Sequence, residues 1–415
     1  MSFEWQDTTL GQICKAQGGA IQTGPFGSQL HTSDYKEFGV PVVMPTNIGE
    51  GGIVEDGIAR IDEADVERLW QHKLRMGDIV FSRRGDVTKN ALIRPHEVGW
   101  FCGTGCLKVR LGDETVATAK FISHYLRLPD IKDWLVRHAV GATMPNLNTG
   151  ILSAVPIYLP PLQTQLEIAE ILGVLDDRIT LLRETNATLE AIAQALFKSW
   201  FVDFDPVRAK LDGRAPEGMD EATAALFPDG FEESELGLVP RGWRVGTLQD
   251  LLVLQRGFDL PAQDRVPGEY PIIAASGPSG THRLAMAKGP GVVTGRSGVL
   301  GRVFLELDDY WPLNTALWVK EFRGATPCYA YEVLRLLDFS SFNAGSAVPT
   351  LNRNHVHSLP YLIPSMKCVE AYEALAIQLH QRVRVNQKQA QTLATLRDTL
   401  LPRLISGQLR LPEVS

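Results

Sequence analysis

The 415-residue chain contains few cysteines and no long apolar run. Its five cysteines show no paired Cys-x-x-Cys spacing, which predicts free thiols in a reducing compartment rather than disulfides. Cys102 and Cys106 are close enough in sequence to offer two metal ligands, but we interpret them as buried thiols. No apolar stretch approaches the roughly 20 residues that span a bilayer, and residues 1–5 lack the start of a signal peptide. The sequence therefore predicts a cytoplasmic protein without a metal site.

Three kinds of catalytic motif are also missing. The glycine-rich segment 295–301 resembles a phosphate-binding loop, but the Lys-Ser/Thr pair that completes such a loop does not follow it. The one Pro-Pro pair, Pro160-Pro161, precedes a helical pattern, whereas adenine methyltransferases hold the flipped base next to Pro-Pro-aromatic. Neither Pro129-Asp130 nor Pro228-Asp229 is followed at a workable distance by the acidic-x-Lys triplet of common metal-dependent nucleases. We therefore expect a non-catalytic chain that uses no cofactor.

The second half of the chain repeats the first. Residues 141–148 (GATMPNLN), followed by Pro156 and Pro160, return 204 positions later as 345–352 (GSAVPTLN), followed by Pro360 and Pro364. Upstream, residues 77–85 resemble 289–297, which aligns Arg84 with Arg296, and residues 5–10 resemble 243–248. The offset there is 238, so copy one has about 34 extra residues, and copy two shows no counterpart of 24–28 (GPFGS). A repeat of this length predicts two similar domains related by an approximate twofold axis.

Each copy ends in a long helical pattern. Apolar residues recur every seven positions from Ile168, and a weaker seam of the same kind begins at Tyr372, so the two helices are expected to pack as an antiparallel coiled coil. A capping box formed by Thr164 and Glu167 is expected to begin the first helix. We predict a mixed α/β (α+β) fold with a domain at 1–161, a helix at 162–202, an acidic connector at 203–240, a domain at 241–364 and a helix at 365–408.

The coiled coil predicts its own register. Each heptad places two residues in the seam, which we call its first and second positions. If the residue numbers of two packed residues sum to 572, every first-position residue of one helix meets a second-position residue of the other, and Asn186 meets Asn386. A slip of one heptad would leave each asparagine facing an apolar residue, at roughly 1 to 3 kcal/mol for each unsatisfied amide. The two asparagines are therefore expected to set the register, the alternative being that each is tolerated at a water-exposed position.

Apart from the first long helix, the acidity behind the net charge of −7 is mainly a property of one connecting segment. Residues 202–238 contain ten acidic and three basic residues, whereas 8–33, 134–166, 270–305 and 339–369 contain no acidic residue. Basic side chains without nearby carboxylates are typical of a surface that meets phosphates. Arg83, Arg84 and Lys89 form a basic turn that matches the acid-free Arg296 segment of copy two. We therefore predict DNA contacts from eight residues, with solvated surface turns as the alternative: Arg83, Arg84, Lys89, Arg283, Lys288, Arg296, Arg302 and Arg353. His355 and His357 alternate on a strand-like run, where we expect core or DNA-facing histidines rather than metal ligands.

Together these features resemble the specificity subunit of type I restriction–modification systems. The resemblance covers almost the whole chain. It rests on the duplicated layout and on these segments: 24–28, 141–160, 345–364, the helix 165–200, and the connector ends 204–210 and 240–243.

This resemblance implies two target-recognition domains, each reading one half of an interrupted, double-stranded DNA sequence, and two long helices that separate them. It also implies docking of two modification subunits, which bind S-adenosylmethionine and methylate adenine, and of restriction subunits, which translocate and cleave DNA. One alternative is a self-sufficient DNA-modifying enzyme, which would need a catalytic motif. The other is a coiled-coil scaffold without a nucleic-acid role, and the acid-free basic segments argue against it.

Overall fold

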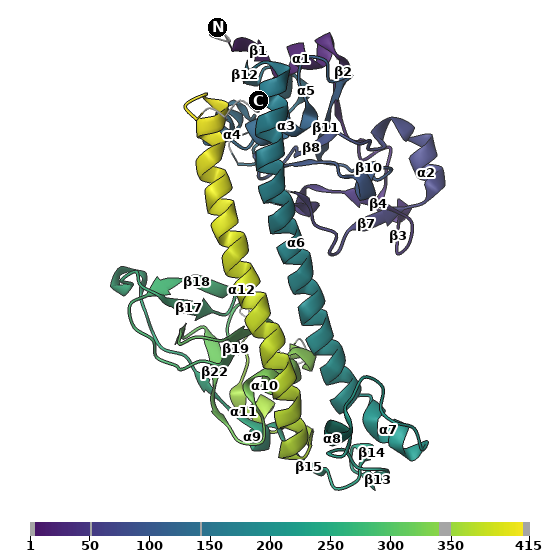
Figure 1. Cartoon of the computed structure of the whole chain (residues 1–415), viewed down its shortest axis with the longest axis vertical. Coiled ribbons are helices and arrows are strands. Elements are labelled where there is room, and N and C mark those ends of the chain that lie inside the picture. The colour runs from purple at the N-terminus through teal and green to yellow at the C-terminus, as the bar shows by residue number, and fades with distance from the viewer. Residues whose placement is uncertain (1–4, 50–51, 142, 340–349, 410–415) are drawn as a thin grey trace, which may run out of the picture. The chain divides into compact units, whose positions relative to one another are not determined.

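The computed structural model describes residues 5–49, 52–141, 143–339 and 350–409 (Figure 1). It divides into two compact units. The N-terminal unit contains Met1–Leu181 and Gln389–Ser415, and the C-terminal unit contains Leu182–Lys388. Each unit therefore combines one β-rich domain with part of each long helix.

The β-rich domain of the N-terminal unit contains two four-stranded sheets. The main sheet has the order β2-β11-β8-β9 and is entirely antiparallel. The second sheet has the order β10-β4-β7-β3, and its strands β10 and β4 pair in parallel. The strands are β1 (Gln6–Thr9), β2 (Gly18–Thr23), β3 (Tyr35–Lys36), β4 (Val40–Val43), β5 (Ile48–Gly49), β6 (Gly52–Ile53), β7 (Ala59–Ile61), β8 (Ile79–Ser82), β9 (Asn90–Leu92), β10 (Phe101–Cys102), β11 (Cys106–Gly112) and β12 (Pro156–Leu159), and the helices are α1 (Leu10–Ala16), α2 (Glu63–Arg68), α3 (Ala119–Tyr125), α4 (Pro129–His138) and α5 (Thr149–Ser153).

The β-rich domain of the C-terminal unit repeats this plan in shorter form. Its main sheet, β16-β22-β19-β20, is antiparallel, and a three-stranded sheet has the order β18-β17-β21. Its elements are α7 (Asp205–Leu211), α8 (Glu221–Ala224), β13 (Phe231–Ser234), β14 (Gly237–Pro240), β15 (Arg244–Thr247), α9 (Leu248–Leu251), β16 (Leu252–Arg256), β17 (Tyr270–Ala274), β18 (Gly277–His282), β19 (Gly291–Gly295), β20 (Val303–Glu306), β21 (Trp311–Pro312), β22 (Ala316–Phe322), α10 (Pro327–Leu336), α11 (Arg353–His357) and β23 (Pro360–Ile363).

In each domain, a strand near the start of the copy pairs with a strand near its end. Strand β1 pairs with β12 so that Thr9 lies opposite Pro156, and β15 pairs with β23 so that Thr247 lies opposite Pro360. Thr9 and Thr247 are separated by the 238-residue offset, and the prolines by the 204-residue offset. Because segments with different offsets form the same pair in both copies, the duplication extends to strand register.

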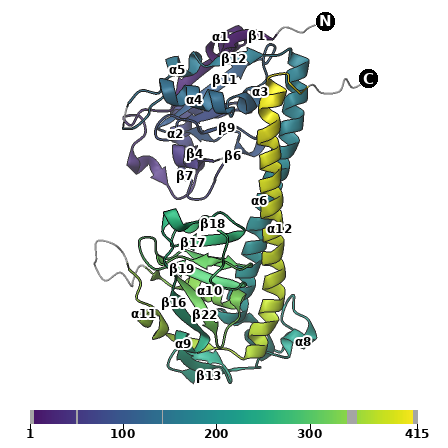
Figure 2. The same cartoon turned by 90° about the vertical axis from the view of Figure 1, so that its left-hand side faces the viewer.

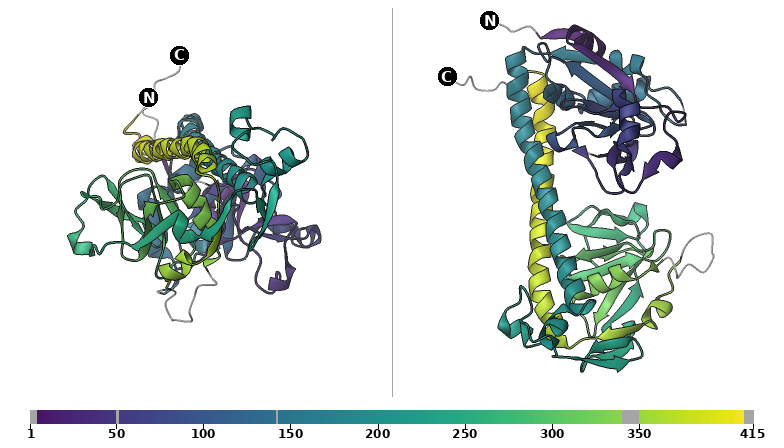
Figure 3. Two further views of the ribbon diagram at one scale, coloured as in Figure 1. Left: turned by 90° about the horizontal axis from the view of Figure 1, so that it is seen from below. Right: turned by 90° about the vertical axis from the view of Figure 1, so that its right-hand side faces the viewer.

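The two long helices are α6 (Leu162–Phe201) and α12 (Met366–Ile405), and they pack antiparallel within each unit (Figures 2 and 3). All twenty seam positions predicted from the heptads are buried or partly buried. In the N-terminal unit Ile168 and Leu172 of α6 share a core with Leu404 of α12. The predicted capping box is wrong, because α6 begins at Leu162 and Thr164 lies inside its first turn.

Candidate nucleic-acid interface

The turns at one end of each main sheet bring several predicted DNA contacts together. In the C-terminal unit, the turn between β19 and β20 consists of residues 296–302, and we call it the second basic turn because it belongs to copy two. Its first residue, Arg296, donates its backbone N–H to Thr315 (2.9 Å) and accepts one from Leu351 (2.8 Å). The side chain of Arg302, at its other end, donates to the carbonyl of Ser276 (2.9 Å). Since Leu351 is two residues before Arg353, these contacts gather Arg296, Arg302 and Arg353 at one end of the sheet.

The N-terminal unit builds the same turn between β8 and β9. This first basic turn, residues 83–89, begins with Arg83, whose N–H donates to Gly105 (2.8 Å) and whose carbonyl accepts from Leu147 (2.9 Å). Lys89 ends it by accepting from the backbone N–H of Ser82 (3.0 Å). In the second basic turn the carbonyl of Arg302 likewise accepts from the backbone N–H of Gly295 (3.2 Å). The backbone contacts therefore correspond one by one, so Arg83 corresponds to Arg296 and Lys89 to Arg302.

The structural offset of the basic turns is thus 213, whereas the sequence alignment used 212. Arg84 therefore corresponds to Ser297 and not to Arg296, and the isolated bridges Arg84–Asn146 and Ser297–Thr350 agree with this. The glycines that allow left-handed turns also correspond, because Gly85 has φ 78° and Gly298 has φ 87°. The alignment by residue type differs by one residue because the backbone hydrogen bonds at the strand ends, and not the residue types, fix where each turn begins.

Copy two does contain a counterpart of Gly24, contrary to the sequence expectation. Gly24 donates its N–H to Cys106 and Gly257 donates to Ala316, which are equivalent residues of β11 and β22. A Cβ at Gly24 would lie 2.1 Å from the carbonyl oxygen of Gly103, and one at Gly257 would lie 2.2 Å from that of Leu313. Close backbone approach therefore demands glycine at both positions, although the following residues differ.

Two predicted contacts lie elsewhere. Lys288 precedes β19, so the five residues of that strand, about 16 Å, separate it from Arg296. Arg283 follows β18, whose opposite end is beside Ser276. The two residues are exposed, but they are not part of the group around the second basic turn.

The histidine prediction was partly wrong. Residues 353–357 form helix α11, in which Asn352 is the N-cap, and not a strand. His357 is buried and its Nε2 accepts the backbone N–H of Leu254 (2.8 Å), whereas His355 is exposed. Burial lowers the pKa of His357, and nearby Arg353 adds to this. Within the described ranges no group of His, Cys, Asp and Glu side chains could hold a metal ion. Residues 345–349 of the second Gly-to-Asn element, and Ala142 of the first, lie outside the described residues.

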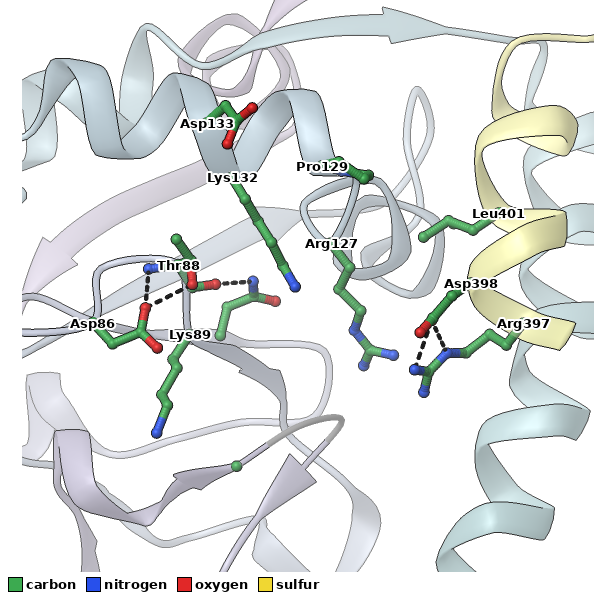
Figure 4. Close-up of a pocket in the computed structure, with 12 residues that line it drawn as sticks. Asp86, Thr88, Lys89, Arg127, Pro129, Lys132, Asp133, Arg397, Asp398 and Leu401 are labelled. Carbon is green, nitrogen blue, oxygen red and sulfur yellow. Dashed lines mark hydrogen bonds and ion pairs between the residues drawn. The ribbon is translucent and has the colours of Figure 1, made fainter. Parts of the chain in front are cut away.

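A cavity of about 420 Å³ adjoins the first basic turn (Figure 4). Lys89 lines it together with Lys132 of α4, Arg127 and, from α12, Arg397. The guanidinium groups of Arg127 and Arg397 point toward each other in Figure 4 because both bind Asp176 of α6, at 2.6 and 2.7 Å. Burial by itself would raise the pKa of Asp176, but Arg127 and Arg397 hold that pKa below its ordinary value. This ion network joins the first β-rich domain to both long helices.

The two seam asparagines lie together in the C-terminal unit. Nδ2 of Asn386 donates to Oδ1 of Asn186 at 2.9 Å, and Nδ2 of Asn186 donates to the carbonyl of Val383 at 3.2 Å. Both side chains are buried. Further along the seam, Tyr372 packs near Trp200, with ring centroids 6.3 Å apart. The arrangement brings the asparagines into hydrogen-bonding contact.

Comparison with known proteins gives a consistent picture. Residues 3–191 match the family model described as type I restriction modification DNA specificity domain. The chain is 22% identical over 323 residues to the type I restriction enzyme MjaIX specificity subunit of Methanocaldococcus jannaschii, covering 71% of this chain and 70% of that protein. It is 24% identical over 337 residues to the type I restriction enzyme HindI specificity subunit of Haemophilus influenzae, covering 66% and 73%.

The fold has a counterpart among solved structures. The crystal structure of the type I restriction–modification system S subunit from M. genitalium aligns over 100% of this chain and 98% of its own, with a TM-score of 0.57 at 16% identity. In the part of this chain that the structure describes, no helix is both long and apolar enough to cross a membrane.

Proposed function

The chain belongs to the DNA specificity subunits of type I restriction–modification systems, and we propose that its two β-rich domains each read one half of an interrupted double-stranded DNA target. A specificity subunit is a non-catalytic member of its system. The observation that carries the proposal is the correspondence of the two basic turns, each held to the main sheet and to a Leu-Asn element by the same backbone hydrogen bonds.

Arginine and lysine at these turns suit DNA for a physical reason. A guanidinium group forms bidentate hydrogen bonds with a guanine edge or with phosphate oxygens, and lysine meets phosphate as a point charge. Arg84 and Arg302 are exposed, and Arg83, Lys89 and Arg296 are partly exposed. We assign the main DNA contacts to these residues and to Arg353. Arg283 and Lys288 we assign to phosphates further along the DNA.

We infer that the long helices hold the two readers apart and dock two modification subunits, which transfer the methyl groups. Restriction subunits would join this assembly in the cytoplasm. Exposed apolar side chains on both helices support docking, because a water-facing apolar stripe is stable when a partner covers it. These include Val174, Ile192, Leu375 and Val385.

The decisive experiment is to co-express the chain with its modification subunit and sequence the methylated sites of the host DNA. We expect one interrupted motif for the unchanged chain. Arg83→Ala should relax or weaken one half of that motif, and Arg296→Ala the other half. If no interrupted motif appears, the proposed function is wrong. If both variants alter the same half, the assignment of one reader to each domain is wrong.

Salt dependence separates phosphate contacts from base contacts. Removal of one side chain that binds a phosphate should reduce the slope of log K against log salt by about 0.9, uniformly across DNA sequences. Removal of a side chain that binds a base through two hydrogen bonds should instead cost roughly 1 to 3 kcal/mol at one position. The same titration of Arg283→Ala and Lys288→Ala decides whether the interface extends to the far end of β19, since an unchanged slope excludes those residues.

A further inference from the structure

Four polar side chains form a connected group beside the second basic turn. Arg256 ends β16, Asp259 follows three residues later, and Asn314 lies in the turn between β21 and β22. Oδ1 of Asp259 accepts from Nη2 of Arg256 at 3.2 Å and also accepts from the amide Nδ2 of Asn314. Nη1 of Arg296 donates to the backbone carbonyl of Asn314 at 3.2 Å. We call Arg256, Asp259 and Asn314 the Asp259 cluster.

Two of the three side chains in the Asp259 cluster are exposed, and the bonds within the cluster hold them together. The side chains of Arg256 and Asp259 are 51% and 66% exposed, and Asn314 is partly buried. An exposed ion pair contributes little to folding, on the order of 0 to 1 kcal/mol. The three side chains therefore do little for stability where they are, yet Asp259 keeps the arginine and the amide beside each other on the face that carries Arg296.

The carboxylate distinguishes this group from a phosphate site. A carboxylate repels phosphate, so Asp259 would weaken a surface whose only role is to bind the DNA backbone. Base edges are different, because adenine offers a donor and an acceptor to an asparagine amide, guanine offers two acceptors to arginine, and cytosine offers a donor to a carboxylate. A fixed group with both donors and acceptors therefore fits base edges.

Copy one does not contain this group. The position of Asn314 corresponds to Thr104, because the next residues, Thr315 and Gly105, accept the equivalent N–H groups of Arg296 and Arg83. There Nε of Arg83 donates to Oδ1 of Asn146 at 3.2 Å, whereas Arg296 turns to the carbonyl of Asn314. The two domains thus share a backbone frame and differ in the side chains that the frame displays.

We propose that Asn314 and Arg256 read base edges in the half-target of the second domain, and that Asp259 is the positioning residue that joins them. This inference rests on the proposed function and adds the residues that give one reader its sequence preference. Because Asp259 holds both partners, its loss should affect more than one base position, whereas loss of Asn314 or Arg256 should affect one.

The test uses the full chain together with its modification subunit. The variants are Asn314→Ala, Arg256→Ala, Asp259→Ala and the milder Asp259→Asn, which keeps an acceptor oxygen. The matched control is Arg323→Ala, which removes another exposed arginine paired with an acidic residue, Glu321 at 3.2 Å, beyond the opposite end of β22. The readouts are the methylated motif and, for each complex, methylation of duplexes in which one half-target position at a time is varied.

We expect Asn314→Ala and Arg256→Ala each to lower discrimination at one position of one half-target by about 5- to 150-fold, the range for removal of a bidentate interaction with a base, and Arg323→Ala to leave the motif unchanged. Asp259→Ala should relax two positions, and Asp259→Asn should relax them less. An unchanged motif in all variants overturns the inference, as does a uniform loss of binding on every duplex, which would indicate phosphate contacts.

If a variant abolishes methylation, its thermal unfolding and its binding to the varied duplexes decide the matter. Loss of selectivity with an unchanged unfolding temperature supports the inference, and a lowered unfolding temperature together with retained selectivity contradicts it. A failed proposed function is recognised separately, because the unchanged chain would then produce no interrupted motif.

Discussion

The two units join their β-rich domains to the long helices by different chemistry. In the N-terminal unit, Asp176 of α6 bonds to Arg127 of the β-rich domain and to Arg397 of α12, and all three side chains are at most 15% exposed. In the C-terminal unit, Phe197 of α6 packs against Tyr329 of α10 and Tyr372 of α12, with ring centroids 5.2 and 5.7 Å apart. One junction is a buried ion network, and the other is an aromatic core.

The repeat shows how the two junctions diverged. The position 204 residues after Asp176 is occupied by His380, and the position 204 residues before Arg397 is occupied by Ala193. Burial lowers the pKa of His380 to about 4, with Arg335 adding to the effect, so this residue is neutral at pH 7. Tyr372 donates its hydroxyl to the carbonyl of Ala193 at 3.2 Å. The ring of His380 packs edge-on against Tyr331, with centroids 5.6 Å apart. Equivalent helix positions therefore hold either a charged network or an uncharged ring.

The aromatic junction should be the more sensitive to truncation. Phe197→Ala is expected to destabilise the C-terminal unit by about 3 to 5 kcal/mol, because it removes a fully buried ring and leaves a cavity between α6, α10 and α12. Hydrogen exchange resolved by peptide, with chemical denaturation, measures the loss. Ile192→Ala is the control, since Ile192 is 44% exposed on the same helix. Equal effects of the two substitutions would show that the aromatic junction is not the main contact.

Breaking the ion network should have the next largest effect. Asp176→Asn is expected to destabilise the N-terminal unit by about 2 to 4 kcal/mol, because two buried guanidinium groups lose their shared carboxylate. Asp177→Asn, at an exposed neighbouring position, should change stability by less than about 0.5 kcal/mol.

The network also predicts a pH dependence. The folded-state pKa of Asp176 is lowered, so its stabilisation is present above the unfolded value of about 4 and is lost as pH falls through the folded pKa. The stability difference between the original chain and Asp176→Asn should therefore be constant from pH 5 to 7 and shrink below about pH 4. A difference that persists in acid would mean that packing and not charge holds this junction.

The asparagine pair tests whether the seam keeps one register. Asn186→Leu should cost about 1 to 3 kcal/mol by leaving the buried amide of Asn386 without its acceptor. Adding Asn386→Leu should recover most of that loss, because two apolar residues then face each other. If the pair sets the register, the double variant should methylate motifs with more than one spacer length. A single, unchanged spacer in the double variant would remove the register role.

The smallest expected effect concerns Glu306 in the second domain. Burial raises its pKa to about 7, although Arg384 opposes this shift. A raised carboxyl pKa means that the native state holds the proton longer than the unfolded chain, so stability falls as pH rises from about 4.5 through 7. Glu306→Gln should remove this slope and stabilise the C-terminal unit by about 1 kcal/mol at pH 8, after allowance for the partial exposure of the side chain. Glu321→Gln, which is exposed, should leave the slope as it is.

Sequence periodicity predicted the long helices well because their signal is local. Heptads repeat within one segment, and a helix buries the same face wherever it packs, so α6 and α12 begin and end within three residues of the predicted bounds. The predicted capping box failed for a local reason too: the carbonyl of Pro161 already accepts the first helical bond, from the N–H of Gln165 at 3.1 Å, so Thr164 lies within the first turn and does not cap it.

The candidate interface was only partly predictable. The acid-free segment 270–305 identified Arg296, and the basic turn that matches it in copy one identified Arg83. The pairing of turns, however, depends on hydrogen bonds to residues more than fifty positions away, such as Leu147 and Leu351. The Asp259 cluster was missed because Arg256, Asp259 and Asn314 have no shared motif. The one signal in the sequence is a carboxylate three residues after an arginine, and a criterion that requires acid-free segments excludes it.

By itself the sequence determined that this protein has two equivalent β-rich domains, two antiparallel amphipathic helices and basic, glycine-containing turns, because duplication, heptad spacing and residue type are properties of the chain. Only the tertiary structure decided which turn residues correspond, which arginines gather at one sheet end, and how Asp176 meets Arg397. These depend on strand register and on the packing of distant segments. A single-residue change of register moves every side chain to the opposite face, and the register here joins strands that are distant in sequence.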